Sequence, residues 1–506
     1  MQLGAEDFGS TIPVSECAEW HYEPDFSELP ERDFEVVILD REVTAEEFEY
    51  LTRFSRAYSL FLTETLLLKK DGLTHQLYVR KMGRRISYEA LKRLLTDELP
   101  DYFPGSYGEK YQPQNMSVAQ GFQGRVAWRG YEGLDLDGEY GDELTQIVFW
   151  RNNIPLFEKQ ALEFWLEYSR DDTVEISLEI TVIQYGYGTV PECQNVWTFS
   201  EKDLEEIVYI ENTTERIGYV FSSIKAKGHG RLTVTALHDR HSRRGKGNFI
   251  PGGGRMVTSE REEVFYYFDP GNLKPPLNVY FSGYKTQEGF EGYYMMRKMR
   301  HPFLLISEAR LEGGCFYIGS EEYEDMIEQI IRRCMGSLGF KGSEVILSGL
   351  SMGTFGALYY GCRIHPNTIL MGKPLASLGD VAENKRINCP DESHSWVDVL
   401  HKICGSQDQD AIKRLNDRFW DLFDRTDWSG TRFAAAYMIE DDLDGNAYEY
   451  LQNHIRDAGV RIYGKGLHGR HNDNTPGIVD WFVNQYRAII WNDFDRMRSE
   501  TGGEEQ

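Results

Sequence analysis

Residues 344–357 read EVILSGLSMGTFGA, and this stretch decides the fold of the chain. Residues 344–348 form an apolar run typical of a short buried strand, and residues 354–362 read as a helix packed through small side chains. Between them, Gly349-Leu350-Ser351-Met352-Gly353 matches the pattern G-x-S-x-G. A strand, a sharp turn and a helix around such a serine expose its hydroxyl at the top of a sheet. The stretch therefore predicts a nucleophilic Ser351; the alternative is a tight turn that carries an idle serine.

A nucleophilic serine needs a base that takes its proton and an acid that orients the base. In α/β-hydrolases these groups follow in the chain order serine, acid, histidine. The predicted strand 434–439 ends in Glu440-Asp441-Asp442, and the loop 464–474 before the last predicted helix carries His468 and His471. The sequence favours Asp441 over Glu440 as the acid. It favours His471 over His468 as the base, because His471 lies nearer the helix start in a polar run.

Two backbone N–H groups are expected to bind the oxyanion of an acyl-transfer reaction. One belongs to Met352, the residue after the nucleophile. The second is expected in the loop after the predicted strand 277–281, at Gly283 or Tyr284. A glycine there lets the backbone approach a substrate closely.

The pattern of strands and helices divides the chain into parts. Residues 1–111 alternate strand and helix, with a capping box at Thr44 and Glu47, and predict a small α/β domain. Residues 112–270 carry short alternating runs separated by turns, which predicts an antiparallel β-sandwich. Residues 271–495 return to α/β alternation and predict an α/β-hydrolase-like catalytic domain. The polar segment 496–506 predicts a flexible tail. The fold class is therefore α/β.

Aromatic residues in the predicted sandwich suggest a carbohydrate-binding surface, although most of them are expected to fill the core. They are Trp128, Tyr131, Trp150, Trp165, Tyr185, Tyr187 and Trp197.

The segment 238–246, HDRHSRRGK, is a basic island in an acidic chain. It is interpreted as a solvated hairpin loop, or else as a contact for an acidic partner or for the next domain's active site. Its two histidines lack a third ligand at suitable spacing, so no metal site is expected.

Composition limits the possible partners. The net charge of -26 over 506 residues argues against binding nucleic acid through the overall field. No apolar stretch is long enough to predict an integral membrane segment, and no signal peptide is recognised at the first residues. Seven scattered cysteines without a C-x-x-C pair are typical of a reducing compartment. A cytoplasmic protein is expected, and no motif indicates a cofactor.

Three segments carry a resemblance to a known family. The elbow 349–356, the run 437–442 and the loop 469–474 resemble the second accessory secretory protein of the accessory Sec system in streptococci and related Gram-positive bacteria. The resemblance covers most of the chain and is most specific in its C-terminal motifs. It implies that the family's serine, acid and histidine fall on Ser351, Asp441 and His471. The family acid is a glutamate, so Asp441 departs from the pattern and Glu440 stays a candidate.

The resemblance also implies two activities. One is export of glycosylated serine-rich-repeat adhesins with the first and third accessory secretory proteins and the accessory SecA motor, which implies a cytoplasmic protein, peripheral at the membrane export site. The other is O-acetylation of N-acetylglucosamine on the adhesin, with an acyl donor that the sequence does not identify. The alternatives are a non-catalytic scaffold of the export complex and a generic cytosolic serine esterase.

Overall fold

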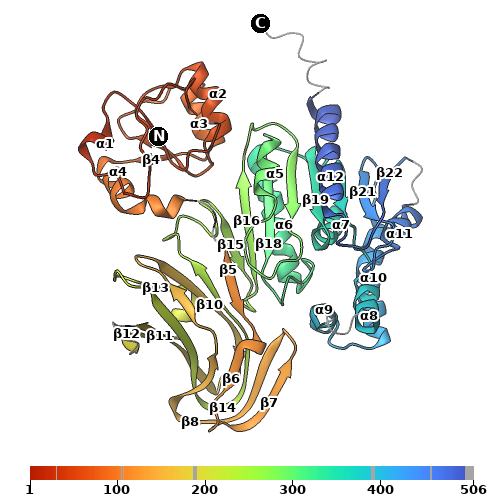
Figure 1. Ribbon diagram of the computed structural model, residues 1–506. Helices are drawn as coiled ribbons and strands as arrows, with labels where there is room; N and C mark the ends of the chain where they lie inside the picture. The colour runs from red at the N-terminus through yellow and green to blue at the C-terminus, as the bar shows by residue number, and fades with distance from the viewer. Residues whose placement is uncertain are drawn as a thin grey trace.

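A computed structural model places the chain in three units, coloured from red to blue along the chain in Figure 1. It describes residues 1–29, 31–103, 105, 107–185, 191–388, 394–455 and 459–495. The predicted tail 496–506 and the aromatic Tyr187 lie outside the described residues. No helix of the part described is both long and apolar enough to cross a membrane.

The N-terminal unit (residues 1–103) is a parallel four-stranded sheet in the order β1-β2-β3-β4. Its strands are β1 (Gln2–Leu3), β2 (Val37–Leu39), β3 (Leu60–Thr63) and β4 (Arg84–Ile86). Its helices are α1 (Phe8–Thr11), α2 (Ala45–Phe54), α3 (Leu73–Arg80) and α4 (Tyr88–Arg93). Helix α2 begins at the capping box predicted for Thr44 and Glu47, in which each side chain bonds the other's backbone N–H.

The β unit (residues 108–241) contains ten strands in one hydrogen-bonded sheet. They are β5 (Gly108–Tyr111), β6 (Met116–Val118), β7 (Gln123–Arg129), β8 (Gly133–Trp150), β9 (Ile154–Leu156), β10 (Ala161–Arg170), β11 (Val174–Tyr185), β12 (Pro191–Ser200), β13 (Val208–Glu211) and β14 (Gly218–His241). The long strand β14 pairs with five of the others: β5, β8, β9, β10 and β11. The β-sandwich predicted for this region is not confirmed, because its strands belong to one hydrogen-bonded sheet that is linked through β14 and the five strands beside it.

The C-terminal unit (residues 254–495) has an eight-stranded sheet in the order β15-β16-β18-β17-β19-β20-β21-β22. Its strands are β15 (Gly254–Val257), β16 (Glu263–Asp269), β17 (Leu277–Phe281), β18 (Phe303–Glu308), β19 (Val345–Leu350), β20 (Thr368–Gly372), β21 (Arg432–Met438) and β22 (Arg461–Leu467). From β18 to β22 the neighbours are parallel, whereas β15 and β16 pair antiparallel at one edge. Strands β15 and β16 lie within the range 112–270 predicted for the sandwich, and β5 lies within 1–111. Strand β5 belongs to the sheet of the β unit, and β15 and β16 belong to the sheet of the C-terminal unit, so the boundaries between units differ from those predicted.

Helices cover both faces of this sheet. They are α5 (Tyr293–Lys298), α6 (Glu321–Leu338), α7 (Met352–Ile364), α8 (Leu378–Asn388), α9 (His394–Cys404), α10 (Gln409–Arg425), α11 (Ala447–His454) and α12 (Thr475–Ile490). Successive residues of β19 point to opposite faces of the sheet. Val345 and Leu347 pack in the core with α6 and α7, whereas Ile346 packs in the core with α5 and α12. This alternation is why the strand reads as a continuous apolar run.

The basic island 238–246 is largely buried at the junction of the units. His238, Arg240 and Arg243 are 0%, 3% and 2% exposed. The Arg243 guanidinium donates to the carbonyl oxygens of Asp101, Phe103 and Phe249. The interpretation as a solvated loop is therefore wrong for most of this segment, and its residues are absent from the lining of the cavity that contains Ser351. The contact with an acidic partner stays a prediction.

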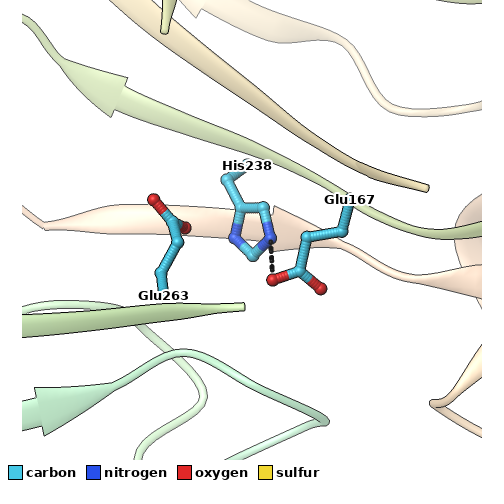
Figure 2. A group of neighbouring side chains, drawn as sticks. All are labelled: Glu167, His238 and Glu263. Atoms are coloured by element: carbon cyan, nitrogen blue, oxygen red, sulfur yellow. Dashed lines mark ion pairs between the residues drawn. The ribbon is translucent and has the colours of Figure 1, made fainter. Parts of the chain in front are cut away.

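A buried ion-pair cluster joins β14 to the C-terminal unit. Arg240 donates to Glu263 at 2.9 and 2.5 Å and to Glu288 at 2.6 Å. The His238 ring lies between Glu167 and Glu263 in Figure 2, and its Nε2 is 3.4 Å from Glu167. Its other nitrogen is 2.5 Å from Glu288. Burial lowers the pKa of His238, but the carboxylates, Glu288 foremost, outweigh burial and raise it to about 9.

The ligand atoms of Glu167, His238 and Glu263 lie within 4.8 Å of one another, close enough to suggest a metal site. However, the Glu263 carboxylate is already occupied by Arg240 and Arg255. The three residues therefore belong to an ion-pair cluster, in which buried charges compensate each other.

Candidate active site

Ser351 stands in the turn between β19 and α7, with φ +50° and ψ -120°. This strained backbone is the geometry expected of the elbow. The flanking glycines are required by close packing. A Cβ at Gly349 would lie 2.3 Å from the carbonyl carbon of Gly353, and one at Gly353 would lie 2.1 Å from the carbonyl oxygen of Phe281. The turn therefore tolerates no side chain at either position.

Three side chains from distant segments form a hydrogen-bonded series. Ser351 Oγ lies 2.8 Å from His471 Nε2, and His471 Nδ1 lies 2.8 Å from Asp441 Oδ2. Asp441 follows the end of β21, and His471 lies in the loop between β22 and α12. The Asp442 carboxylate accepts the backbone N–H of His471 at 3.0 Å, which holds the loop in place. This arrangement lets the imidazole take a proton from Ser351 while Asp441 fixes its tautomer.

The alternative acid and base pair with each other on the surface. The Glu440 carboxylate lies 3.0 Å from His468 Nδ1, and these side chains are 51% and 86% exposed. By contrast, the Asp441 and His471 side chains are each 4% exposed. Burial raises the pKa of Asp441, but the hydrogen bond and charge of His471 and two backbone N–H groups outweigh it, so the pKa lies below its ordinary value. Asp441 therefore stays ionised beside the imidazole.

A cavity of about 640 Å³ opens above Ser351. Its lining combines apolar, aromatic and charged residues: Tyr131, Gly283, Tyr284, Glu291, Glu312, Leu350, Ser351, Lys373, Lys385, Ser395, Trp396, Leu443, His471, Asn472 and Thr475. Gly283 and Tyr284, predicted near the oxyanion, both belong to this lining. Asp441 and Glu440 do not, because Asp441 lies behind His471 and Glu440 lies on the surface.

The predicted oxyanion donors lie on either side of the turn. Met352 is the first residue of α7, where N–H groups lack a partner within the helix. The Gly283 N–H, however, donates to the Glu291 carboxylate at 2.7 Å. Tyr280 donates its hydroxyl to the same carboxylate oxygen at 3.3 Å. Sequence reasoning missed Glu291, because no motif marks an isolated glutamate in a loop.

Comparison with known proteins places the chain in a family. The family described as Accessory Sec system GspB-transporter matches residues 1–496. The chain belongs to this family. An accessory Sec system protein of Streptococcus gordonii is 36% identical over 511 residues, which cover 98% of this chain and 99% of the relative. A second, from Staphylococcus aureus, is 42% identical over 396 residues, covering 78% of this chain and 75% of the relative.

A solved structure shares the fold of almost the whole chain. It is the Glycosylation Associate Protein (Gap123) complex from Streptococcus agalactiae, with 33% identity and a TM-score of 0.84. The match covers 97% of this chain and 98% of that chain. The family expected from the elbow, the run 437–442 and the loop 469–474 is therefore confirmed.

Proposed function

We propose that this protein is a serine-dependent acyltransferase of the α/β-hydrolase type, which acetylates N-acetylglucosamine on a glycosylated adhesin. The observation that supports it most is the hydrogen-bonded series of Ser351, His471 and Asp441 beneath a cavity of about 640 Å³. A cavity of this size fits a small ligand such as a sugar ring.

The chemistry follows from the positions of the three groups. His471 Nε2 takes the proton of Ser351 as Oγ attacks the carbonyl carbon of an acyl donor. The Met352 N–H stabilises the oxyanion, and Asp441 stabilises the imidazolium. His471 then protonates the leaving group, which leaves an acyl-Ser351. A sugar hydroxyl next gives its proton to His471 and attacks this ester. His471 returns the proton to Ser351 Oγ as it leaves, so that the acyl group moves to the sugar and the serine is restored.

We further propose that the chain acts in export as part of an assembly. Its family membership and its likeness to the Gap123 complex support assembly with the first and third accessory secretory proteins. The accessory SecA motor and a serine-rich-repeat adhesin are the other proposed partners. A scaffold without catalysis is the second candidate; the three-unit layout and the net charge of -26 allow it, because a fold does not by itself imply an activity.

The test is mass spectrometry of exported adhesin glycans from wild-type, Ser351→Ala and Ser429→Ala cells, with export yield measured in the same samples. Ser429 is an exposed serine in the turn before β21 and serves as the matched control. Loss of acetyl groups only in Ser351→Ala, with export retained, is the expected result. Unchanged acetylation would refute the enzyme and leave the scaffold.

A further inference from the structure

One turn of the β unit reaches the active-site cavity of the C-terminal unit. Tyr131 lies between β7 and β8 and lines the cavity together with Ser351 and His471. The other residues of the lining come from residues 283–475. The hydrogen-bonded series of Ser351, His471 and Asp441 is complete without Tyr131. Tyr131 therefore contributes to the wall of the cavity and not to the series itself.

The turn is fastened to α9 by several contacts. The backbone N–H of Tyr131 donates to the Asp398 carboxylate at 2.6 Å. The Glu132 carboxylate lies 2.5 Å from His401 Nδ1. Gly130 has φ +48°, and a Cβ there would lie 2.2 Å from an Asp398 carboxylate oxygen. The backbone of the turn is therefore held in one position, and the Tyr131 ring is presented from a fixed base.

Tyr131 shares the cavity lining with two further aromatic residues and a carboxylate. Tyr284 follows β17, and Trp396 lies on α9 with its ring 5.1 Å from that of Phe316. Burial, and next the Glu312 carboxylate beside the hydroxyl, raise the pKa of Tyr131 to about 12. The same two causes raise the pKa of Tyr284. Glu312, Tyr131 and Tyr284 all line the cavity, and the Glu312 carboxylate lies near both tyrosine hydroxyls.

These groups match the chemistry of a sugar ring. A pyranose has an apolar C–H face, which stacks on aromatic rings, and an edge of hydroxyl groups, which donate to a carboxylate. We infer that Tyr131, Tyr284, Trp396 and Glu312 form the subsite for the acceptor sugar, with Tyr131 as a specificity-determining residue. This inference rests on the proposed function, since it names the place of the acceptor in that reaction.

The subsite has a consequence for the fate of the acyl group. A sugar hydroxyl that loses its proton to His471 and attacks acyl-Ser351 gives a sugar ester and restores the serine. Water that reacts in the same way gives the free acid instead. A sugar held against Tyr131 takes the place of water, because binding raises its effective concentration at the ester.

The test measures sugar binding separately from catalysis. N-acetylglucosamine binding to full-length Ser351→Ala protein is followed by ligand-observed NMR, alone and combined with Tyr131→Ala, Tyr131→Phe or Glu312→Gln. Tyr209→Ala is the matched control, because Tyr209 is a tyrosine of the β unit that is 66% exposed and outside the cavity lining. Circular dichroism checks that each variant is folded.

We expect Tyr131→Ala to weaken sugar binding about tenfold, and Tyr131→Phe to weaken it less, since it keeps the ring face. Glu312→Gln should also weaken it, and it provides the test if Tyr131→Ala does not fold. When the same variants are made in protein that keeps Ser351, the ratio of acetyl transfer to hydrolysis should fall more for Tyr131→Ala than for Tyr131→Phe. Equal binding by Tyr131→Ala and Tyr209→Ala would overturn the subsite.

The two proposals fail in different ways. If the wild-type protein transfers acetyl groups to the sugar but Tyr131→Ala binds sugar as well as Tyr209→Ala does, the subsite is wrong and the proposed function stands. If sugar binding depends on Tyr131 but the wild-type protein transfers no acetyl group, the subsite stands and the proposed function is wrong.

Discussion

If the proposed activity is correct, replacement of Glu291 by alanine is expected to raise the rate at which the protein hydrolyses small esters. In the structure the Glu291 carboxylate accepts the Gly283 N–H at 2.7 Å, the donor that an oxyanion would need. The carboxylate must leave before the oxyanion can bind there. Burial lowers the pKa of Lys285 and of Lys373. The charge of Glu291 partly offsets this at Lys285, and those of Asp441 and then Glu291 partly offset it at Lys373, so the Glu291 carboxylate lies within electrostatic reach of two cations.

The magnitude follows from the bond that is lost. A hydrogen bond to a charged group contributes about 1.5–3 kcal/mol, and each ~1.4 kcal/mol of barrier is tenfold in rate. Glu291→Ala is therefore expected to raise kcat/KM about ten- to a hundredfold. Glu291→Gln keeps a neutral acceptor for the Gly283 N–H, so its increase should be smaller.

The assay is hydrolysis of p-nitrophenyl acetate by the purified full-length proteins, with Ser351→Ala as the blank. Wild type, Glu291→Gln and Glu291→Ala should form a rising series. A tenfold or greater fall in both Glu291 variants, with unchanged thermal unfolding, would refute the reasoning. The carboxylate would then be needed for turnover rather than stand in the oxyanion's place.

The remaining predictions concern the acid and the buried junction. Asp441→Asn should lower kcat on p-nitrophenyl acetate about 10⁴-fold, whereas Glu440→Gln should change it less than about threefold; equal losses would contradict the assignment. Arg240→Ala should lower the free energy of unfolding in urea by about 3–5 kcal/mol, because it removes the cation that the buried carboxylates of Glu263 and Glu288 share, and a loss below about 1 kcal/mol would count against this. Because the pKa of His238 is raised from 6.5 to about 9 in the folded protein, the protonated ring stabilises the fold. This stabilisation is fully present below pH 6.5 and is lost as the pH rises through about 9. Unfolding free energy should fall by about 3 kcal/mol over that range, and His238→Gln should remove most of this slope.

The elements around Ser351 could be predicted because local signals agree there. The apolar run of β19, the glycines of the turn and the small residues of α7 each favour the same strand-turn-helix. The capping box at Thr44 and Glu47 was predictable for the same reason, since both partners lie within four residues. Short-range signals of this kind do not depend on the rest of the fold.

The choice between neighbours could not be settled from sequence. Glu440 and Asp441 are adjacent, so only the three-dimensional path of the chain after β21 decides which carboxylate meets His471. The burial of the basic island was not predicted, because its partners Glu263, Glu288 and Asp101 lie outside it along the chain. A run of charges is normally solvated, and only long-range partners make its burial possible.

The pairing of β14 has a consequence for the order in which the chain folds during synthesis. The strands β5, β8, β9, β10 and β11 all precede it, yet each needs residues 218–241 as a hydrogen-bonding neighbour. The sheet can therefore close only after those residues have left the ribosome, and long strands such as β8 and β11 wait with open edges until then. The same residues then supply Arg240 to Glu263 and Glu288, so completion of the β unit prepares the surface on which the C-terminal unit docks.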